Sequence, residues 1–419
     1  MDKDFVRLQA IAQQFASEAQ IEAIAPLGNG NINSTFLVTL DADLNRSARR
    51  FVLQRINAQV FPQPKLVIQN MATLCKHLSD DATDALGLQS SRRWEMPQIL
   101  PTQQGEHFWL DESGAYWRAI SFVENSHVCE TVEDVHHAKE IGYGLAMFHR
   151  LISTLSADEL ADTLPGFHIT PSYLADYERV LANRAEDAAD TEQAANADDA
   201  VDVVDAGNAL DLDRPDDRPD DRPDDRLNGR LSDATAEQVQ FCLNFIEARK
   251  EWAHVLEQAK AKGHLHLRPI HGDPKVNNIL LGDRGEAVSL IDLDTLKPGL
   301  VHYDIGDCLR SGCNPLGEET EDWQHVTFDT ALAKAMLQGY LSLARDFLTA
   351  QDYDYLYDAI RLIAFELGLR FFTDYLAGNV YFKVKHPTHN LTRALVQFKL
   401  TESIEQQADT LDAIIQALR

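Results

Sequence analysis

The sequence predicts an α+β protein with two lobes, a small strand-rich N-terminal lobe and a larger, mainly helical C-terminal lobe. Its 419 residues are enough for two lobes of ordinary domain size. The β-prone segments gather between about residues 25 and 124, whereas apolar residues recur at helical spacing from about residue 125 onward. We therefore expect one lobe over residues 1–124 and the other over residues 125–419.

The predicted N-terminal lobe combines one antiparallel sheet with two helices. Apolar residues recur at helical spacing in two segments, and four runs are rich in the β-branched and aromatic residues that favour strands. The predicted helices cover 4–18 and 64–78, and the predicted strands cover 35–40, 49–56, 107–110 and 116–123. The first two strands are expected to form a hairpin, and the last two are expected to pair with each other.

The predicted C-terminal lobe begins with a helix over Val135 to Ile152, where apolar residues recur every three or four positions. Further helices are predicted from near Ser172, over Ala234 to Lys262, and from about residue 323 to the C-terminus, including Tyr355 to Leu376. Between them, two short apolar runs, 279–281 and 288–291, flank the turn sequence DRGE and predict a hairpin.

An acidic, low-complexity insertion is predicted at about 186–233. It contains the four-residue repeat DRPDDRPDDRPDDR (213–226), which offers no apolar face, and each Pro removes a backbone donor. We expect a solvated, mobile segment. A docking tail for a partner is the alternative interpretation.

The composition excludes some functions. The net charge of −28 argues against sequence-independent binding of nucleic acid or of an anionic membrane, since both need a basic surface. The five cysteines are scattered without CxxC spacing, which favours a reducing compartment, and we expect the cytoplasm. No signal peptide or membrane span is predicted, because no apolar run reaches the required ~18 residues.

The segment HGDPKVNN (271–278) carries the chemistry, together with IDLD (291–294) across the predicted hairpin. Phosphoryl transfer needs a carboxylate that orients the attacking hydroxyl and a cation that faces the γ-phosphate. Asp273 can supply the carboxylate, and Lys275, two residues later, can supply the cation.

Phosphoryl transfer also needs oxygen ligands for Mg²⁺ on the phosphates. Asn278 follows Asp273 by five residues, and Asp292 lies across the hairpin, so both are candidate ligands. Asp294 is either a supporting acid of the same site or an ordinary loop acid. A chance match within a structural turn is the alternative for the whole set.

These motifs resemble the aminoglycoside phosphotransferase and choline kinase superfamily, which has a bilobal protein-kinase-like fold. The pattern HGDPKVNN…IDLDT…PG…YDIGDCLRSG looks closer to the N-acetylhexosamine 1-kinase-like sugar kinases. Further matching stretches are GNGNINSTF (28–36), FVLQRIN (51–57), LPGFH (164–168) and FELGLRFFTDYLAGNVYFK (365–383). The matches cover most of the chain outside the acidic insertion.

The resemblance implies a role for each matching residue. Asp273 would be the catalytic base, and Asn278 and Asp292 would bind Mg²⁺. Asp304 would organise the catalytic loop, and His271 would support the backbone of that loop.

The nucleotide site implied by the resemblance is formed by Gly28, Gly30, Arg55, Phe122, Val123 and Glu124. Gly28 and Gly30 would let the backbone approach the ATP phosphates, although a plain hairpin turn would also explain them. Arg55 would pair with the phosphates, unless it is a surface residue of its strand. The backbone at 122–124 would bind adenine.

The facing helix departs from the kinase pattern. It should carry a Glu that holds the cation of the third strand, but the best match is the neutral Gln69.

Five other residues have structural explanations. Asp307 and Arg310 are three positions apart and are expected to form an ion pair. Glu366 and Arg370 have the four-residue spacing of a helical salt bridge, with a place at the binding site as the alternative. His168 is expected to be a structural loop residue.

The sequence thus predicts an ATP- and Mg²⁺-dependent kinase that phosphorylates a hydroxyl of a small molecule, with a sugar as the first expectation. The anomeric hydroxyl of an N-acetylhexosamine is the specific candidate. One alternative is a phosphotransferase for an aminoglycoside or a choline-type amino alcohol. Another is an ATP-binding regulatory module without turnover. The sequence leaves the oligomeric state open.

Overall fold

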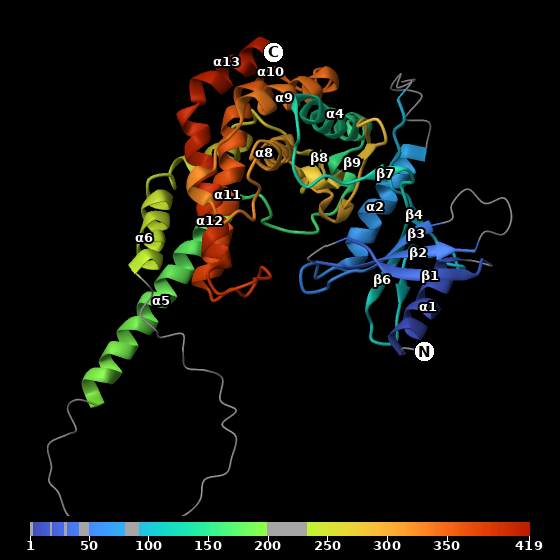
Figure 1. The fold of residues 1–419 in the computed structure, drawn as a ribbon, viewed down its shortest axis with the longest axis horizontal. Helices are drawn as coiled ribbons and strands as arrows, with labels where there is room; N and C mark the ends of the chain where they lie inside the picture. The colour runs from blue at the N-terminus through green and yellow to red at the C-terminus, as the bar shows by residue number, and fades with distance from the viewer. Residues whose placement is uncertain (1–2, 17–18, 29–31, 42–49, 80–91, 199–232) are drawn as a thin grey trace, which may run out of the picture.

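The structure, a computed structural model, describes residues 3–16, 19–28, 32–41, 50–79, 92–198 and 233–419. A β-sheet with two helices forms the N-terminal lobe, and a larger, mainly helical part forms the rest (Figure 1). The predicted α+β architecture is confirmed. Among the described helices, none combines enough length with enough apolar residues to span a bilayer.

The N-terminal lobe contains a six-stranded sheet in which all the pairs are antiparallel. The strands are β1 (Ile21–Pro26), β2 (Ser34–Leu40), β3 (Arg50–Arg55), β4 (Ile99–Leu100), β5 (Trp109–Leu110) and β6 (Tyr116–Ser121). Their order is β1-β2-β3-β6-β4, and β5 also pairs with β6. The predicted hairpin of β2 and β3 and the predicted pairing of β5 with β6 are confirmed, whereas β1 and β4 were not predicted.

Each face of this sheet is covered by one helix. Helix α1 (Lys3–Ala16) packs on one face over a small apolar core that includes Leu53 and Trp117. Helix α2 (Pro64–Ser79) covers the other face and joins the main core of the protein. Since side chains alternate along a strand, neighbouring residues of β3 and β6 face different helices.

The C-terminal lobe is built from packed helices. They are α4 (Val135–Ile152), α5 (Thr170–Asp198), α6 (Asp233–Glu247), α7 (Val255–Ala261), α8 (Val301–Gly312), α9 (Thr330–Ala344), α10 (Ala350–Asp354), α11 (Leu356–Leu376), α12 (His389–Gln406) and α13 (Ala408–Leu418). Helices α4 and α9 touch through two glycines. A Cβ on Gly142 would lie 1.9 Å from the Met336 carbonyl oxygen, and one on Gly339 would lie 2.0 Å from the Lys139 carbonyl oxygen. Any side chain there would force the helices apart.

Short strands and turns hold the motif segments between the lobes. Strand β7 (Ser126–His127) pairs with β9 (Ile279–Gly282), which pairs with β10 (Ala287–Leu290), and β8 (Arg268–Ile270) pairs with β11 (Lys297–Gly299). The chain therefore leaves β8 at the first motif and leaves β10 at the second. Both motifs are anchored by paired strands.

Two predicted segments differ from the structure. The helix expected over 234–262 is divided into α6, a 3₁₀ turn at Trp252–His254, and α7. Helix α5 continues to Asp198, into the segment predicted to be a mobile insertion. This stretch is rich in Ala, Glu and Gln, which favour helix. The Arg-Pro-Asp-Asp repeat lies outside the described residues.

Candidate active site

Asp273 and Lys275 form the centre of the first motif. The Nζ atom of Lys275 lies 2.8 Å from Oδ2 of Asp273, and the Asp273 backbone N–H donates to Nδ1 of His271 over 3.2 Å. Burial alone would raise the pKa of Asp273, but the charge of Lys275 outweighs it and holds this pKa below its ordinary value. The carboxylate is therefore ionised at neutral pH and sits beside a cation.

A second carboxylate, from helix α8, fixes the backbone just before Asp273. The Asp304 side chain is fully buried and accepts hydrogen bonds from the backbone N–H groups of His271 (2.7 Å) and Gly272 (2.8 Å). Its Oδ2 atom also lies 2.8 Å from Nε2 of His149, whose Nδ1 atom bonds the Tyr340 hydroxyl. Asp304 thus organises the loop, as its position in the motif implies.

The loop is held from the other side by His168. Its Nε2 atom lies 2.7 Å from the Gly272 carbonyl oxygen, and its Nδ1 atom lies 2.9 Å from Oε1 of Glu366. The other oxygen of Glu366 accepts from the Thr170 hydroxyl over 2.7 Å. The salt bridge expected between Glu366 and Arg370 is wrong, because His168 and Thr170 take the carboxylate.

Glycine is required at position 272. Its φ is +88°, and a Cβ there would lie 2.7 Å from the Thr295 carbonyl oxygen. The hydroxyl of Thr295 donates to the His271 carbonyl oxygen over 2.8 Å. The two motif segments are therefore joined directly.

Asn278 and Asp292 lie on adjoining backbone. The Ile291 N–H donates to the Asn278 carbonyl oxygen over 2.9 Å, and Nε2 of His271 lies 2.9 Å from the Ile291 carbonyl oxygen. The side-chain amide of Asn278 donates to the Asp273 carbonyl oxygen over 2.7 Å, so its Nδ2 atom faces the loop and its Oδ1 atom remains as a donor for a metal.

Asp292 is in the left-handed backbone conformation, with a φ of 64°. Burial and then the nearby charge of Asp294 raise the pKa of Asp292 to about 7, against the lowering effect of the Lys275 charge. This crowding of negative charge is what a divalent cation would relieve.

The donor set fits Mg²⁺. Asp292 and Asn278 offer hard oxygen atoms, which Mg²⁺ prefers. Among the described residues no group of three or more His, Cys, Asp or Glu side chains is arranged to hold a metal. An ion held by Asp292 and Asn278 would therefore take its remaining ligands from water and phosphate oxygens, as Mg²⁺ commonly does.

Residues 291–296, which include the candidate metal ligand Asp292, are called the metal loop below. The cation of the N-terminal lobe that contacts this loop is Arg118, not Arg55. The β3–β6 register pairs Arg55 with Trp117 and Gln54 with Arg118. Trp117 belongs to the core under α1, so Arg55 points to the α1 side of the sheet, where its side chain is exposed. Arg118 points the other way and forms an ion pair with Asp294. This placement argues against the predicted role of Arg55.

Helix α2 does not provide the partner expected at Gln69, which is exposed on its outer face. The next residue, Asn70, is buried and donates to the carbonyl oxygens of Ala161 and Leu296, both over 2.8 Å. Helix α2 is therefore joined to the metal loop by a neutral amide.

The structure places the predicted nucleotide residues at the sheet and the connector. Gly28 has a φ of +71°, which suits a glycine turn, and Gly30 lies outside the described residues. Val123 is buried in a small apolar cluster with Leu280, Val288 and Ile291 of the β9–β10 hairpin. Apolar side chains of the hairpin therefore pack against residues 122–124, the connector between the lobes.

Phe122 and Glu124 are linked through Arg50 of β3. The Arg50 guanidinium lies 4.4 Å from the centre of the Phe122 ring, and its Nε atom donates to the Glu124 carboxylate over 3.0 Å. Arg93 donates to the Glu124 backbone carbonyl. The Glu124 side chain is thus committed to Arg50.

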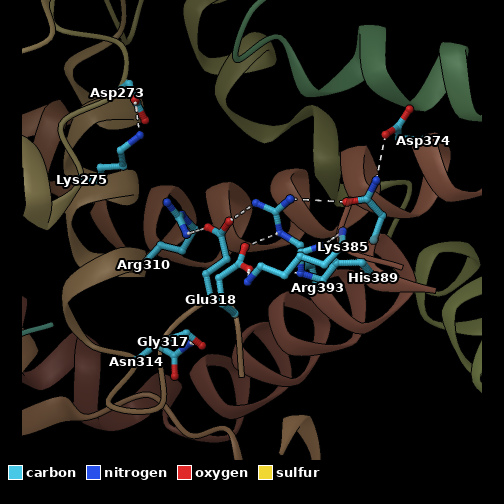
Figure 2. Close-up of polar contacts among 12 residues, drawn as sticks. Asp273, Lys275, Arg310, Asn314, Gly317, Glu318, Asp374, Lys385, His389 and Arg393 are labelled. Carbon is cyan, nitrogen blue, oxygen red and sulfur yellow. Dashed lines mark hydrogen bonds and ion pairs between the residues drawn. The ribbon is translucent and has the colours of Figure 1, made fainter. Parts of the chain in front are cut away.

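Next to Asp273, a chain of alternating charges runs across the C-terminal lobe (Figure 2). Arg310 donates to Asp307 over 2.8 Å, as its spacing predicted, and to Glu318 over 3.0 Å. Glu318 also accepts from Arg393 over 2.6 Å, so it lies between two guanidinium groups. Burial would raise the pKa of Glu318, but the charges of Arg310 and Arg393 hold it below its ordinary value.

Arg370 is surrounded by aromatic rings. Its guanidinium lies 5.2 Å from the ring centre of Phe167, 5.0 Å from that of Tyr173 and 5.5 Å from that of Phe382. Burial tends to lower the pKa of Arg370, but nearby groups, Asp273 among them, raise it overall. A fixed cation and several aromatic faces therefore lie near Asp273.

Comparisons with known proteins agree with this fold. An aminoglycoside phosphotransferase from Alicyclobacillus acidocaldarius shares the fold with a TM-score of 0.55 and 15% identity, over 98% of this chain and 95% of that chain. A choline kinase from Cryptosporidium parvum matches with a TM-score of 0.53 and 14% identity, over 99% and 98% of the two chains. These likenesses confirm the bilobal kinase-like fold.

The family follows from the sequence match rather than from the fold. The model of the phosphotransferase enzyme family matches residues 23–348. This is more than half of the 419 residues. The chain therefore belongs to the phosphotransferase enzyme family and is an ATP-dependent phosphotransferase with a hydroxyl group as acceptor.

Proposed function

We propose that the protein transfers the γ-phosphoryl group of ATP to a hydroxyl of a neutral sugar, with the anomeric hydroxyl of an N-acetylhexosamine as the leading candidate. The observation that carries this proposal is that the carboxylates near Asp273 have partners within the protein. Glu318 lies between Arg310 and Arg393, Asp307 shares Arg310, and Glu366 is held by His168.

A cationic acceptor would be bound best by carboxylates that have no other counter-charge. Here Glu318 and Glu366 are engaged through both oxygens by arginine or by buried hydrogen-bond donors. Asp307 pairs with Arg310 through Oδ1, and only its Oδ2 atom has no hydrogen-bond partner among these three described carboxylates. The guanidinium of Arg370 with the rings of Phe167 and Tyr173 instead offers donors and apolar faces. Both suit the hydroxyls and the ring of a neutral sugar.

In the proposed reaction the acceptor hydroxyl oxygen attacks the γ-phosphorus, the bond to the β-phosphate oxygen breaks, and ADP leaves. Asp273 orients the hydroxyl and takes its proton. A carboxylate with a lowered pKa is a weak base, which is sufficient because the transition state is loose and the proton leaves late. Lys275, already beside Asp273, would face the transferred phosphoryl group.

Asp292 and Asn278 would hold Mg²⁺, which would neutralise charge on the phosphates. His271, Asp304 and His168 keep the loop that carries Asp273 in place through backbone hydrogen bonds. Preformed geometry of this kind is the main contribution that a protein makes to phosphoryl transfer.

For the nucleotide, we propose that residues 1–124 supply most of the binding lobe and residues 125–419 the catalytic lobe. Gly28 would approach the phosphates, and the backbone at Phe122 and Val123 would meet the base. The apolar cluster around Val123 supports this proposal, because a purine is flat and largely apolar on its faces. Glu124 would act through Arg50, which steadies the connector.

The second candidate is a phosphotransferase for an aminoglycoside or a choline-type amino alcohol. The names of the two solved structures, an aminoglycoside phosphotransferase and a choline kinase, favour it. A third candidate, a regulatory module that binds ATP without turnover, would bind nucleotide and form no phosphorylated product.

The test is an ADP-release screen with Mg²⁺ and ATP against N-acetylhexosamines, hexoses, choline and aminoglycosides. We expect turnover with an N-acetylhexosamine and none with its methyl glycoside, whose anomeric oxygen is blocked. Turnover of the methyl glycoside would move the reaction to another hydroxyl, and turnover of the cationic acceptors alone would refute the sugar proposal.

The matched variants are Asp273→Asn and Asp283→Asn. Asp283 lies in the exposed turn of the neighbouring hairpin, so its change leaves the site intact. Asp273→Asn should lower kcat by about 10²–10⁴-fold, the usual contribution of a positioned base. Equal turnover by both variants would remove Asp273 from the mechanism.

A further inference from the structure

In kinase-like folds a cation on the third strand pairs with the nucleotide phosphates and with an acid on the facing helix. Neither residue is present in that form here. The inner-face residue of β3 is the neutral Gln54, because Arg55 points to the α1 side. Helix α2, PKLVIQNMATLCKHLS, contains no acidic residue.

Both charges are nevertheless present at the same place, on other elements. Arg118 lies on β6, directly opposite Gln54 in the sheet, and only 1% of it is exposed. Asp294 belongs to the turn at Leu293–Thr295 and is 3% exposed. Their side chains form an ion pair within this buried region.

The pair is built into a network. The Oε1 atom of Gln54 accepts from Nε (3.1 Å) and Nη2 (2.8 Å) of Arg118, which fixes the guanidinium plane. The side-chain amide of Asn33, at the end of the glycine turn, donates to the second oxygen of Asp294. The Oδ1 atom of Asn33 in turn accepts from the Asn57 N–H over 2.9 Å. Two residues of the N-terminal lobe, Arg118 and Asn33, therefore meet on one carboxylate of the C-terminal lobe, and each is held by a further residue of its own lobe.

Asp294 lies two residues after Asp292, in the same turn. A contact that fixes Asp294 therefore fixes the orientation of the metal ligand. A buried ion pair is a poor source of stability, because removing both charges from water costs about as much as their attraction returns. The buried pair at this position is therefore better explained by a functional role than by stability.

One donor of Arg118 is still available. Within the described part of the chain, Nη1 is buried and has no hydrogen-bond partner. An unpartnered guanidinium N–H beside the metal loop is a strong donor for an anionic oxygen. A phosphate oxygen of the nucleotide would satisfy it.

We propose that Arg118 replaces the third-strand cation of the kinase-like fold. Its ion pair with Asp294 positions the metal loop beneath the N-terminal sheet, and its Nη1 atom binds a phosphate oxygen of the nucleotide. This inference rests on the proposed nucleotide site but is independent of the identity of the acceptor.

The test measures ADP binding by calorimetry, with Mg²⁺ and with EDTA, so that neither turnover nor an acceptor is needed. The variants are Arg118→Gln, Asp294→Asn, the double variant that carries both, and Arg55→Gln as the matched control on the other face. The double variant matters most, because it removes both charges and leaves no unpaired buried ion that could unfold the protein.

We expect the double variant to bind ADP about tenfold or more weakly and to gain less affinity from Mg²⁺ than the wild type does. The ADP affinity of the double variant should be no more than about threefold below that of the weaker-binding single variant. Two residues that act as a pair do not have additive effects on binding. Arg55→Gln should bind ADP within about twofold of the wild type.

A second double variant, Gln54→Arg with Arg118→Gln, returns the cation to β3 on the same face, and we expect it to recover part of the lost affinity. A purely structural role would lower thermal stability and leave both the ADP affinity and its Mg²⁺ dependence unchanged.

Wild-type ADP affinity in the Arg118→Gln/Asp294→Asn variant would overturn the inference, as would an equal loss in Arg55→Gln. Failure of the wild-type protein to bind ADP at all would instead refute the proposed nucleotide site. The two failures are therefore distinguishable in one experiment.

Discussion

Replacing Asp304 by Asn is expected to destabilise the protein and to slow phosphoryl transfer, although Asp304 touches neither substrate in the proposed mechanism. The two carboxylate oxygens accept three hydrogen bonds. One oxygen takes the His271 N–H (2.7 Å) and the imidazole of His149 (2.8 Å), and the other takes the Gly272 N–H (2.8 Å). Asn has only one oxygen acceptor.

The magnitude follows from the bond that is lost. If the amide oxygen keeps the bonds to His271 and His149, its NH₂ group faces the Gly272 N–H, and a buried donor is left unsatisfied at a cost of about 1–3 kcal/mol. The bonds that remain lose their charge, which removes a further ~1–2 kcal/mol. Together the change should lower the free energy of unfolding by about 2–5 kcal/mol, or Tm by roughly 2–6 °C for a chain of this size.

Two quantities are measured: Tm by thermal unfolding, and kcat with the acceptor that the screen identifies. The matched control is Asp346→Asn, which alters an exposed pair with Arg150 and should change stability by less than about 0.5 kcal/mol. The Asp304→Asn variant should also lose turnover by about 10²-fold, because the loop that carries Asp273 is less firmly held. A Tm and a kcat equal to those of the control would refute the view that Asp304 organises this loop.

The remaining predictions concern the same loop and its neighbour. Gly272→Ala should cost about 1–3 kcal/mol from the positive φ alone and abolish turnover, because the Cβ would meet Thr295; a melting curve and a kcat like those of the wild type would contradict this. Lys275→Met should lower kcat more than it raises the KM for ATP, since the cation acts on the transferred group; a change in KM alone would remove that role. His168 gives a pH prediction: burial opposes protonation, but the charge of Glu366 raises its pKa above 6.5 overall. Its contribution to stability is therefore complete below pH 6.5 and is lost as pH rises through the folded pKa, so urea midpoints should fall at alkaline pH in the wild type and change less in His168→Gln.

Local patterns in the sequence were sufficient for the elements whose burial repeats along one segment. The helix predicted over Val135 to Ile152 has these limits in the structure, because one face is apolar throughout and Asp134 caps its first turn by accepting from two backbone N–H groups. The same holds for the hairpin of β9 and β10, where a glycine with positive φ closes the turn. In such segments the residues that determine the structure lie close together in the sequence.

The support of the catalytic loop could not be predicted in this way, because its partners lie far apart in the sequence. His168 contacts Gly272 and Glu366, at separations of 104 and 198 residues. The four-residue spacing of Glu366 and Arg370 suggested a local salt bridge. Helix α11 is buried, however, and a buried carboxylate is best satisfied by fixed donors such as His168 and Thr170. Helical spacing shows which residues share a face but not what lies opposite that face.

The same limit explains the misplaced cation. Alternation along β3 implies that Gln54 and Arg55 face opposite sides, but it does not reveal which side meets the metal loop, since both sides of this sheet are covered by a helix. Family resemblance favoured Arg55, because a cation on the third strand is expected. The register with β6 decides the matter physically: Trp117 draws Arg55 to the α1 side, and the position opposite Gln54 is filled by Arg118. A cation can therefore keep its place in space while moving to the neighbouring strand, as long as the new residue points to the same face and finds an acid there. Asp294 is that acid, so a search for the cation in related sequences should examine the strand that pairs with β3 as well as β3 itself.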